Sequence, residues 1–294
     1  MTPPLPVQLT ALDPQYPSRL RGLPDAPASL TTAGGALEAD RVVAIVGSRD
    51  AAPDAAAFAR DLASTLADLG IVVVSGGALG IDAAAHKGAL AAGGRTWAVA
   101  PTGHDAVFPE QHASLFDQIA RGPGAMIWPF APDYRHRSGF LARNRVLVAL
   151  ADVVVVVQAG FPSGALRAAA VARTLGRPLW VVPAPPWFDG FRGSRLLLDG
   201  GGARPLLFVD GFLASLGARA PARPQDRAPP LRPLNQSEAA ALAATSTAPL
   251  HLDEIATRAA LSAQAAASAL LTLSLENVVV EGPPGFFARR DAAR

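Results

Sequence analysis

The sequence predicts an α/β fold, in which helices cover a parallel sheet, followed by a smaller unit of three helices and a hairpin. Two observations lead to this prediction. Between residues 41 and 217, short runs of β-branched residues alternate with Ala/Leu-rich stretches, which is typical of parallel strands joined by crossover helices. Within each run the apolar residues are consecutive rather than alternating, as expected of strands that are buried on both faces.

The elements expected in this region follow one another as strand and helix. The predicted strands are Val42–Val46, Ile71–Ser75, Thr96–Ala100, Ala125–Trp128, Val153–Gln158, Leu179–Val182 and Leu206–Val209. The predicted helices are Ala55–Leu69, Ala83–Ala92, Gln111–Arg121, Leu141–Leu150 and Ala165–Leu175.

Changes in composition divide the chain into four parts. Residues 1–40 are expected to form an N-terminal extension, and residues 41–217 the α/β domain. Residues 218–234 are rich in proline and arginine and lack hydrophobic periodicity, which is typical of a linker. Residues 235–294 predict a winged-helix domain, with a hairpin across a Gly-Pro-Pro-Gly turn. Its elements are predicted at Gln236–Ala244, Leu252–Ala259, Ala263–Leu275, Val278–Glu281 and Phe286–Arg290.

Composition excludes several classes of function. The chain has no cysteine, which excludes thiolate catalysis and Cys-ligated zinc and fits a reducing cytoplasm. Its first residues lack the cationic start and apolar core of a secretory signal. No apolar run approaches the roughly 20 residues that a membrane helix needs. We therefore expect a soluble, cytoplasmic protein that does not contact a membrane.

The distribution of charge is more informative than the net charge of +2. From Tyr134 to Phe188 the only acidic residue is Asp152. The same stretch holds seven arginines: Arg135, Arg137, Arg143, Arg145, Arg167, Arg173 and Arg177. This local excess is compatible with a polyanionic ligand.

Three turns that follow predicted strands carry small residues directly before a helix. They are Gly47-Ser48-Arg49, the segment from Gly76 to Gly80, and Ser163-Gly164. Glycine lets a ligand approach the backbone, and a helix N-terminus offers unpaired N–H groups. A single glycine turn is an ordinary connection, but three at one edge of a Rossmann-like sheet favour a phosphate-bearing ligand. The dinucleotide fingerprint and the Walker A motif are both absent, so no nucleotide cofactor is expected.

Five motifs occur in order along the α/β region. They are Val43–Arg49, residues 75–90, Thr96–Pro109, Phe140–Arg145 and Ser163–Ala169. In this order they resemble the GSR, SGLAxGID…AHxGAL, TxAVxGxGxDxxYP, FPxRNR and SGSLxTA motifs of the DNA-processing protein A (DprA/Smf) family. The chain departs from the family at Trp128-Pro129 and at Gln158, and the N-terminal helical domain common in the family has no counterpart. It is therefore identified as a divergent member.

The resemblance implies a protein that binds single-stranded DNA without catalysing a reaction. It implies protection of incoming DNA in natural transformation, loading of the recombinase RecA, and a homodimer, for which an apolar edge near Leu196–Leu198 is available. Single-stranded DNA needs donors for its phosphates and flat apolar surface for its bases. The residues expected to contact DNA are Gly47, Ser48, Arg49, Gly76, Gly80, Phe140, Arg143, Asn144, Arg145, Ser163 and Gly164, with Phe140 stacking on a base and no metal or cofactor involved.

Structural interpretations remain open for several of these residues. Phe140 could belong to the core, since most aromatic side chains are buried. Arg145 could form an ion pair with Asp152 or another acid. Asp82 and His86 lie one helical turn apart and could form an acid–base or metal pair. A helix-capping Asp beside a structural His explains the same spacing.

Two other functions compete with DNA binding. A nucleotide hydrolase resembling the cytokinin-activating phosphoribohydrolases would need a carboxylate after its glycine turn. Here no acid follows the turn at Phe161–Leu166 before Asp189. A transcription regulator would read duplex DNA with the winged helix. Between Gln236 and Ala288, however, five acids oppose a single arginine, which favours contact with a protein.

Overall fold

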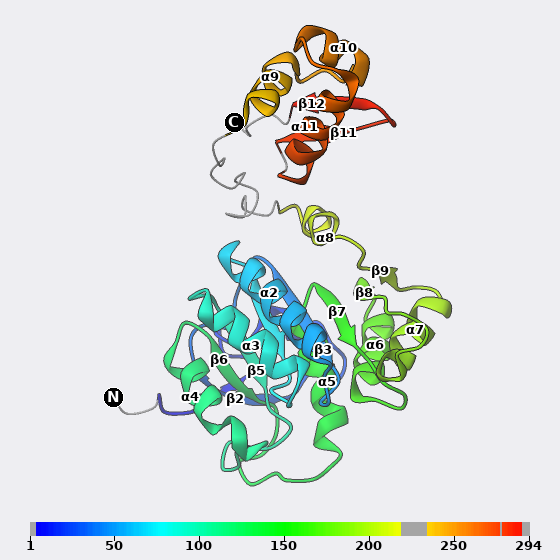
Figure 1. The fold of residues 1–294 in the computed structure, drawn as a ribbon. Coiled ribbons are helices and arrows are strands. Elements are labelled where there is room, and N and C mark those ends of the chain that lie inside the picture. The colour runs from blue at the N-terminus through cyan, green and yellow to red at the C-terminus, as the bar shows by residue number, and fades with distance from the viewer. Residues whose placement is uncertain (1–3, 219–233, 277, 290–294) are drawn as a thin grey trace. The chain divides into compact units, whose positions relative to one another are not determined.

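The computed structural model describes residues 4–218, 234–276 and 278–289. The chain divides into two compact units, residues 1–221 and 222–294 (Figure 1). The predicted linker at 218–234 lies, apart from its two end residues, outside the described residues.

Among the described residues of the first unit, nine strands form one sheet in the order β1-β2-β6-β5-β4-β3-β7-β8-β9. From β6 to β9 in this order, neighbouring strands are parallel. The parallel strands are β3 (Val42–Gly47), β4 (Val72–Ser75), β5 (Thr96–Val99), β6 (Ala125–Trp128), β7 (Val153–Gln158), β8 (Leu179–Val181) and β9 (Arg204–Pro205). The predicted α/β class is therefore confirmed.

Helices cover both faces of this sheet. Consecutive residues of each strand point to opposite faces, and since both sets are apolar, both faces must be buried. Val42, Ala44 and Val46 of β3 pack with α5 and α6, whereas Val43 and Ile45 pack with α2, α3 and α8. The helices are α2 (Pro53–Asp68), α3 (Ile81–Ala91), α4 (Ala113–Arg121), α5 (Gly139–Leu150), α6 (Gly164–Thr174), α7 (Arg192–Asp199) and α8 (Val209–Ser215). Within the described residues, none of the helices is long and apolar enough to span a bilayer.

The strand predicted at Leu206–Val209 is wrong. The last strand of the sheet, β9, lies just before it, and its pairing ends where the Leu206 N–H donates to the Val181 carbonyl at 2.8 Å. Val209 begins α8, in which Phe212 and Leu213 are buried; together with the buried Leu216 directly after the helix, they have helical rather than strand spacing.

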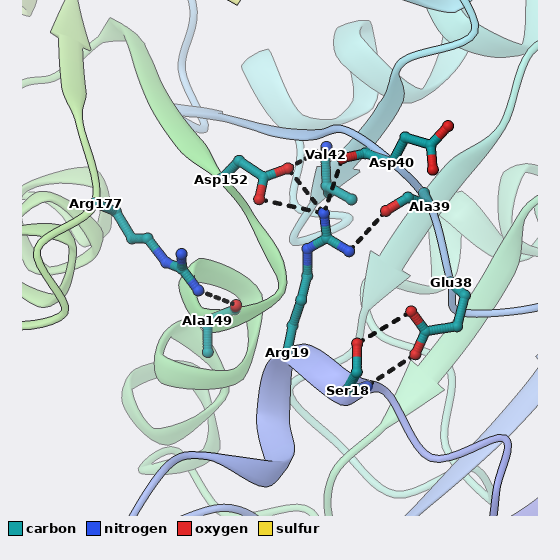
Figure 2. Close-up of polar contacts among 9 residues, drawn as sticks. All are labelled: Ser18, Arg19, Glu38, Ala39, Asp40, Val42, Ala149, Asp152 and Arg177. Atoms are coloured by element: carbon teal, nitrogen blue, oxygen red, sulfur yellow. Dashed lines mark hydrogen bonds and ion pairs between the residues drawn. The ribbon is translucent and has the colours of Figure 1, made fainter.

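The residues expected to form an N-terminal extension contribute to the same sheet. β1 (Val7–Thr10) pairs antiparallel with β2 (Ser29–Gly34), and β2 pairs antiparallel with β6. Between them, α1 (Ser18–Arg21) places Arg19 against the core. Its guanidinium lies 2.9 Å from the Asp152 carboxylate and donates to the Ala39 carbonyl at 2.7 Å (Figure 2). Asp152 also accepts from the Val42 N–H at 2.8 Å, so one carboxylate joins α1, β3 and the start of β7.

The second unit is a winged helix, as the sequence predicts. Helices α9 (Gln236–Ala244), α10 (Leu252–Arg258) and α11 (Ala263–Leu275) pack around Leu242, Ile255 and Leu270. The predicted hairpin is formed by β11 (Val279–Glu281) and β12 (Phe286–Arg289), while Arg290 lies outside the described residues. A short strand that the sequence did not predict, β10 (Leu250–His251), pairs with β12.

Candidate functional site

A pocket opens at the carboxyl ends of β3 and β7. From β3 the chain continues to β4 on one side, whereas β7 lies on the other side of β3. This is the topological switch point at which open α/β sheets bind their ligands. Eight of the predicted contact residues line the pocket: Gly47, Ser48, Arg49, Phe140, Arg143, Asn144, Ser163 and Gly164.

Gly80 joins the turns that follow β3 and β4. The Ile81 N–H, at the start of α3, donates to the Ser48 carbonyl at 3.1 Å. Gly80 has a φ of +74°, and a Cβ there would lie 2.3 Å from the same carbonyl oxygen. Both the conformation and the close approach therefore require glycine. Gly80 does not line the pocket; it packs against the Ser48 carbonyl and so supports a residue that does.

Gly76 makes room for the guanidinium of Arg143. A Cβ on Gly76 would lie 2.0 Å from Arg143 Nη1, so the guanidinium rests directly on the glycine backbone. Arg143 Nη1 donates to the Val99 carbonyl, and Nε donates to Asn144 Oδ1 at 3.2 Å. With only 5% of its surface exposed, Arg143 forms part of the pocket floor.

A buried carboxylate accompanies this buried guanidinium. Burial raises the pKa of Asp82, and the charge of Arg143 opposes that rise. Burial in turn lowers the pKa of Arg143, against the attraction of Asp82. Asp82 Oδ2 also accepts from the Ala78 N–H at 3.3 Å, across the turn that begins α3. Asp82 is therefore a buried structural residue, but it does not cap α3: the N-cap is Gly80, which has no side-chain capping bond, and the carboxylate bonds to the preceding turn.

His86 is fully buried beneath the same turn. Its Nδ1 lies 2.7 Å from Thr96 Oγ1, and the Thr96 hydroxyl donates to the Val73 carbonyl at 2.9 Å. Because that hydroxyl proton is already used, Nδ1 must be the donor to Thr96. Burial lowers the pKa of His86 to about 3, so the ring is neutral at physiological pH. In the described part of the chain, no three His, Cys, Asp or Glu side chains are grouped as metal ligands.

Phe140 lies at the rim rather than in the core. The Arg49 guanidinium lies 4.8 Å above its ring, and the edge of Phe108 contacts it at 5.2 Å between ring centroids. Phe140, Arg49 and Leu141 also line a second pocket that includes Arg135 and Arg137. Because the two pockets share these residues, we call them together the groove.

The start of α6 closes the other side of the groove. The Ser163 hydroxyl caps the helix by accepting from the Leu166 N–H at 3.4 Å. Asn144 Nδ2 donates to the Gly164 carbonyl at 3.4 Å and so ties α5 to α6. Gly164 and Ala165, in the first turn of α6, also line the pocket, so the end of the helix that carries unpaired N–H groups borders it.

The structure places Arg145 away from the other predicted residues. It also places in the groove a residue that the sequence did not single out, Arg167. Arg145 does not line the groove, and its guanidinium forms an ion pair with Asp25 rather than with Asp152. Arg167, exposed in the first turns of α6, does line the groove. The signal for Arg167 was its position one helical turn after the Ser163-Gly164 motif.

Comparisons with known proteins agree with this architecture. Residues 8–217 match the family model of DNA recombination-mediator protein A, and residues 225–285 match the DprA winged helix domain. A DNA processing protein DprA from Mycobacterium tuberculosis is 43% identical over 164 residues, which cover 55% of this chain and 42% of that relative. The matched part of this chain thus spans less than half of the relative's length.

Two solved structures of DNA processing protein A resemble the chain. The Helicobacter pylori protein, described for its single-stranded DNA binding mode, has a TM-score of 0.65 at 31% identity and covers 72% of this chain and 95% of its own. The Streptococcus pneumoniae protein has a TM-score of 0.66 at 32% identity and covers 71% and 73%. The family model matches well over half of the sequence, and the chain belongs to the DNA recombination-mediator protein A (DprA/Smf) family.

Proposed function

We propose that this chain binds single-stranded DNA in the groove and catalyses no reaction there. The observation that carries the proposal is the convergence of three strand-to-helix turns on one groove that combines exposed arginines with an aromatic ring. Phosphates need the first feature and unstacked bases need the second. The related H. pylori protein, with its single-stranded DNA binding mode, supports the same ligand class.

The arginines of the groove fall into two kinds. Arg49 and Arg167 are exposed, and no hydrogen bond or ion pair holds their guanidinium groups within the described residues. They are free to form bidentate contacts with phosphate oxygens. Arg143 already donates to protein acceptors, so it contributes positive potential from the floor. When Arg49 turns toward a phosphate, the face of Phe140 that it covers becomes available to a base.

The side chains around the pocket also fit binding better than hydrolysis. The turn at Phe161–Leu166 carries no carboxylate, and Asp82 is buried near Arg143. The groove does contain two other carboxylates, Asp50 after β3 and Glu110 in the second pocket, but neither belongs to the turn at which the phosphoribohydrolases carry theirs. A glycosidic cleavage would need a carboxylate facing the sugar. Turnover of a nucleoside monophosphate by the purified protein would favour the hydrolase instead.

Loading of RecA, protection of DNA in natural transformation and homodimer formation are part of the proposal through family membership. Leu196 on α7 is exposed, whereas Leu197 is buried, so one leucine of the proposed apolar edge is available to a partner.

In the winged helix, Glu238 is buried in a capping box with Asn235. The other four acids between Gln236 and Ala288 still outnumber the single arginine in this range, which disfavours binding to phosphates. We therefore propose that this unit contacts a protein rather than DNA.

The test is a titration of labelled oligo-dT and of a duplex of equal length at two salt concentrations. We expect a preference for the single strand and a steep loss of affinity with salt. Arg49→Ala and Arg167→Ala should each weaken oligo-dT binding about tenfold and reduce the salt slope by about one. Arg60→Ala, on α2 outside the groove, is the matched control and should change neither. Equal affinity for the duplex, or full binding by both groove variants, would contradict the proposal.

A further inference from the structure

Three aromatic side chains are exposed beside the groove. Phe161 is 56% exposed, Trp187 77% and Phe188 48%. The Arg192 guanidinium lies 5.3 Å above the Phe161 ring. We call these four residues the aromatic surface. Large aromatic side chains left exposed in one region of the surface are typical of an interaction site.

The aromatic surface is joined to the groove through the loop between β7 and α6. The Ser194 N–H donates to the Ala159 carbonyl at 3.1 Å, and the Ala159 N–H donates to Ser194 Oγ at 3.0 Å. A Cβ on Gly193 would lie 2.3 Å from the Gly160 carbonyl oxygen, so α7 begins in direct contact with this loop. The same loop continues through Phe161 to Ser163, which lines the groove. Figure 1 shows α6 and α7 side by side at this end of the sheet.

The segment that carries Trp187 is held in place by polar contacts. Arg195 Nη1 donates to the carbonyls of Pro185 and Phe188 at 3.0 and 2.8 Å. Gln158 Nε2 donates to the Gly190 carbonyl at 3.3 Å. These bonds fix the backbone on both sides of Trp187, while its indole stays in solvent. The ring is therefore presented outward rather than folded into the core.

We propose that the aromatic surface extends the path of single-stranded DNA beyond the groove. The inference rests on the proposed function. Bases that leave the groove past Ser163 would stack on Phe161 and Trp187, and Arg192 would contact a phosphate between them. Two observations favour DNA over a protein partner: Phe161 lies two residues before Ser163, which lines the groove, and Arg192 lies over the Phe161 ring, so the surface combines arginine with flat rings as a single-strand platform does.

Trp187 makes the proposal measurable by fluorescence. Of the four tryptophans, Trp97 is fully buried and Trp128 and Trp180 are partly buried, so Trp187 is the one most open to a base. We expect an oligo-dT of about 20 nucleotides to quench the emission of the wild-type chain. Trp187→Phe should remove most of the quenching and keep the affinity within about twofold. Trp187→Ala should weaken binding of this oligonucleotide about five- to tenfold, as the loss of one stacked base predicts.

Oligonucleotide length separates the surface from the groove. An oligo-dT of about six nucleotides, which occupies the groove alone, should bind Trp187→Ala and the wild type equally. If Trp187→Ala binds the long oligonucleotide normally while Arg49→Ala does not, the extension is wrong and the groove stands. If light scattering shows that Trp187→Ala loses a dimer and the long oligonucleotide binds it normally, the surface belongs to a second copy of the chain. If the wild type binds no oligonucleotide, the proposed function itself fails.

Discussion

Asp82, His86 and Arg143 lie together beneath the groove, where burial decides what each side chain can do. Arg143 donates to the Val99 carbonyl and to Asn144 and is only 5% exposed, so its charge acts from beneath the surface. His86 is held neutral by burial and by its donation to Thr96. We therefore expect direct contacts with a ligand to come from residues at the rim, such as Arg49, Arg167 and Phe140, which line the pocket.

The lowered pKa of His86 predicts that the first unit loses stability in mild acid. Between pH 6.5 and about 3, the unfolded chain binds a proton at His86 and the folded chain does not, so stability falls as the pH is lowered through this range. From pH 7 to pH 5 the loss should reach about 2 kcal/mol. Asp82 acts in the opposite direction, because its raised pKa favours the folded state on acidification. Urea unfolding at both pH values measures the sum.

A His86→Asn variant isolates the contribution of the histidine. Asparagine keeps a donor near the position of Nδ1 for the Thr96 hydroxyl but does not titrate. The variant should therefore lose less stability than the wild type between pH 7 and pH 5. An unchanged pH dependence would show that His86 is not the group responsible.

At the scale of elements, the turns after β4 and β7 use their glycines in different ways. Gly76 is enclosed by the Arg143 guanidinium, whereas a Cβ on Gly164 would meet no heavy atom within 4 Å. Gly164 also begins α6, where alanine is a better helix former. Packing within the protein thus requires glycine at position 76. At position 164 only a ligand that packs against the helix end would require it.

This difference predicts opposite outcomes for one substitution at two sites. Gly76→Ala should displace Arg143 from the floor, destabilise the fold by about 2 kcal/mol or more and weaken oligo-dT binding. Gly164→Ala should keep the melting temperature within a few degrees. If a phosphate packs on the helix end, Gly164→Ala should nevertheless weaken binding. Thermal melting with a parallel titration measures both effects, and a normal melting temperature for Gly76→Ala would refute the packing argument.

The sequence predicts the buried strands and their helices well, because consecutive apolar runs such as Val153–Gln158 have few other structures available. It does not predict β1 and β2, whose polar positions Gln8, Thr31 and Thr32 hide the strand pattern. β2 pairs with β6, about 90 residues away in the chain, and β1 in turn pairs with β2, so both strands depend on this distant pairing. α8 was missed for a different reason, since Leu206–Val209 is apolar enough for a strand and the helical spacing begins only at its end.

The candidate site was predictable to the extent that it depends on strand ends. Gly47, Ser48, Arg49, Ser163 and Gly164 follow strands and so meet at one edge. What a side chain does after it reaches that edge depends on its packing. The sequence therefore could not predict that Gly76 and Gly80 support the groove without lining it. Nor could it predict that Arg145 pairs with Asp25.

For the whole molecule, the small net charge conceals an uneven distribution. The arginines of the groove lie in one unit, together with Phe140 and the aromatic surface. The winged helix instead exposes Asp253, Glu254 and Glu281. Because phosphate neutralisation dominates affinity for nucleic acid, binding should depend on the first unit.

Photo-cross-linking tests this central claim most directly. An oligo-dT that contains 4-thiothymidine is bound to the full chain, irradiated and digested, and the attached peptides are identified by mass spectrometry. We predict attachment to peptides from the groove, those that contain Phe140 or the stretch from Phe161 to Arg167. Attachment confined to residues 235–289 would contradict the account, because it would place the DNA on the winged helix.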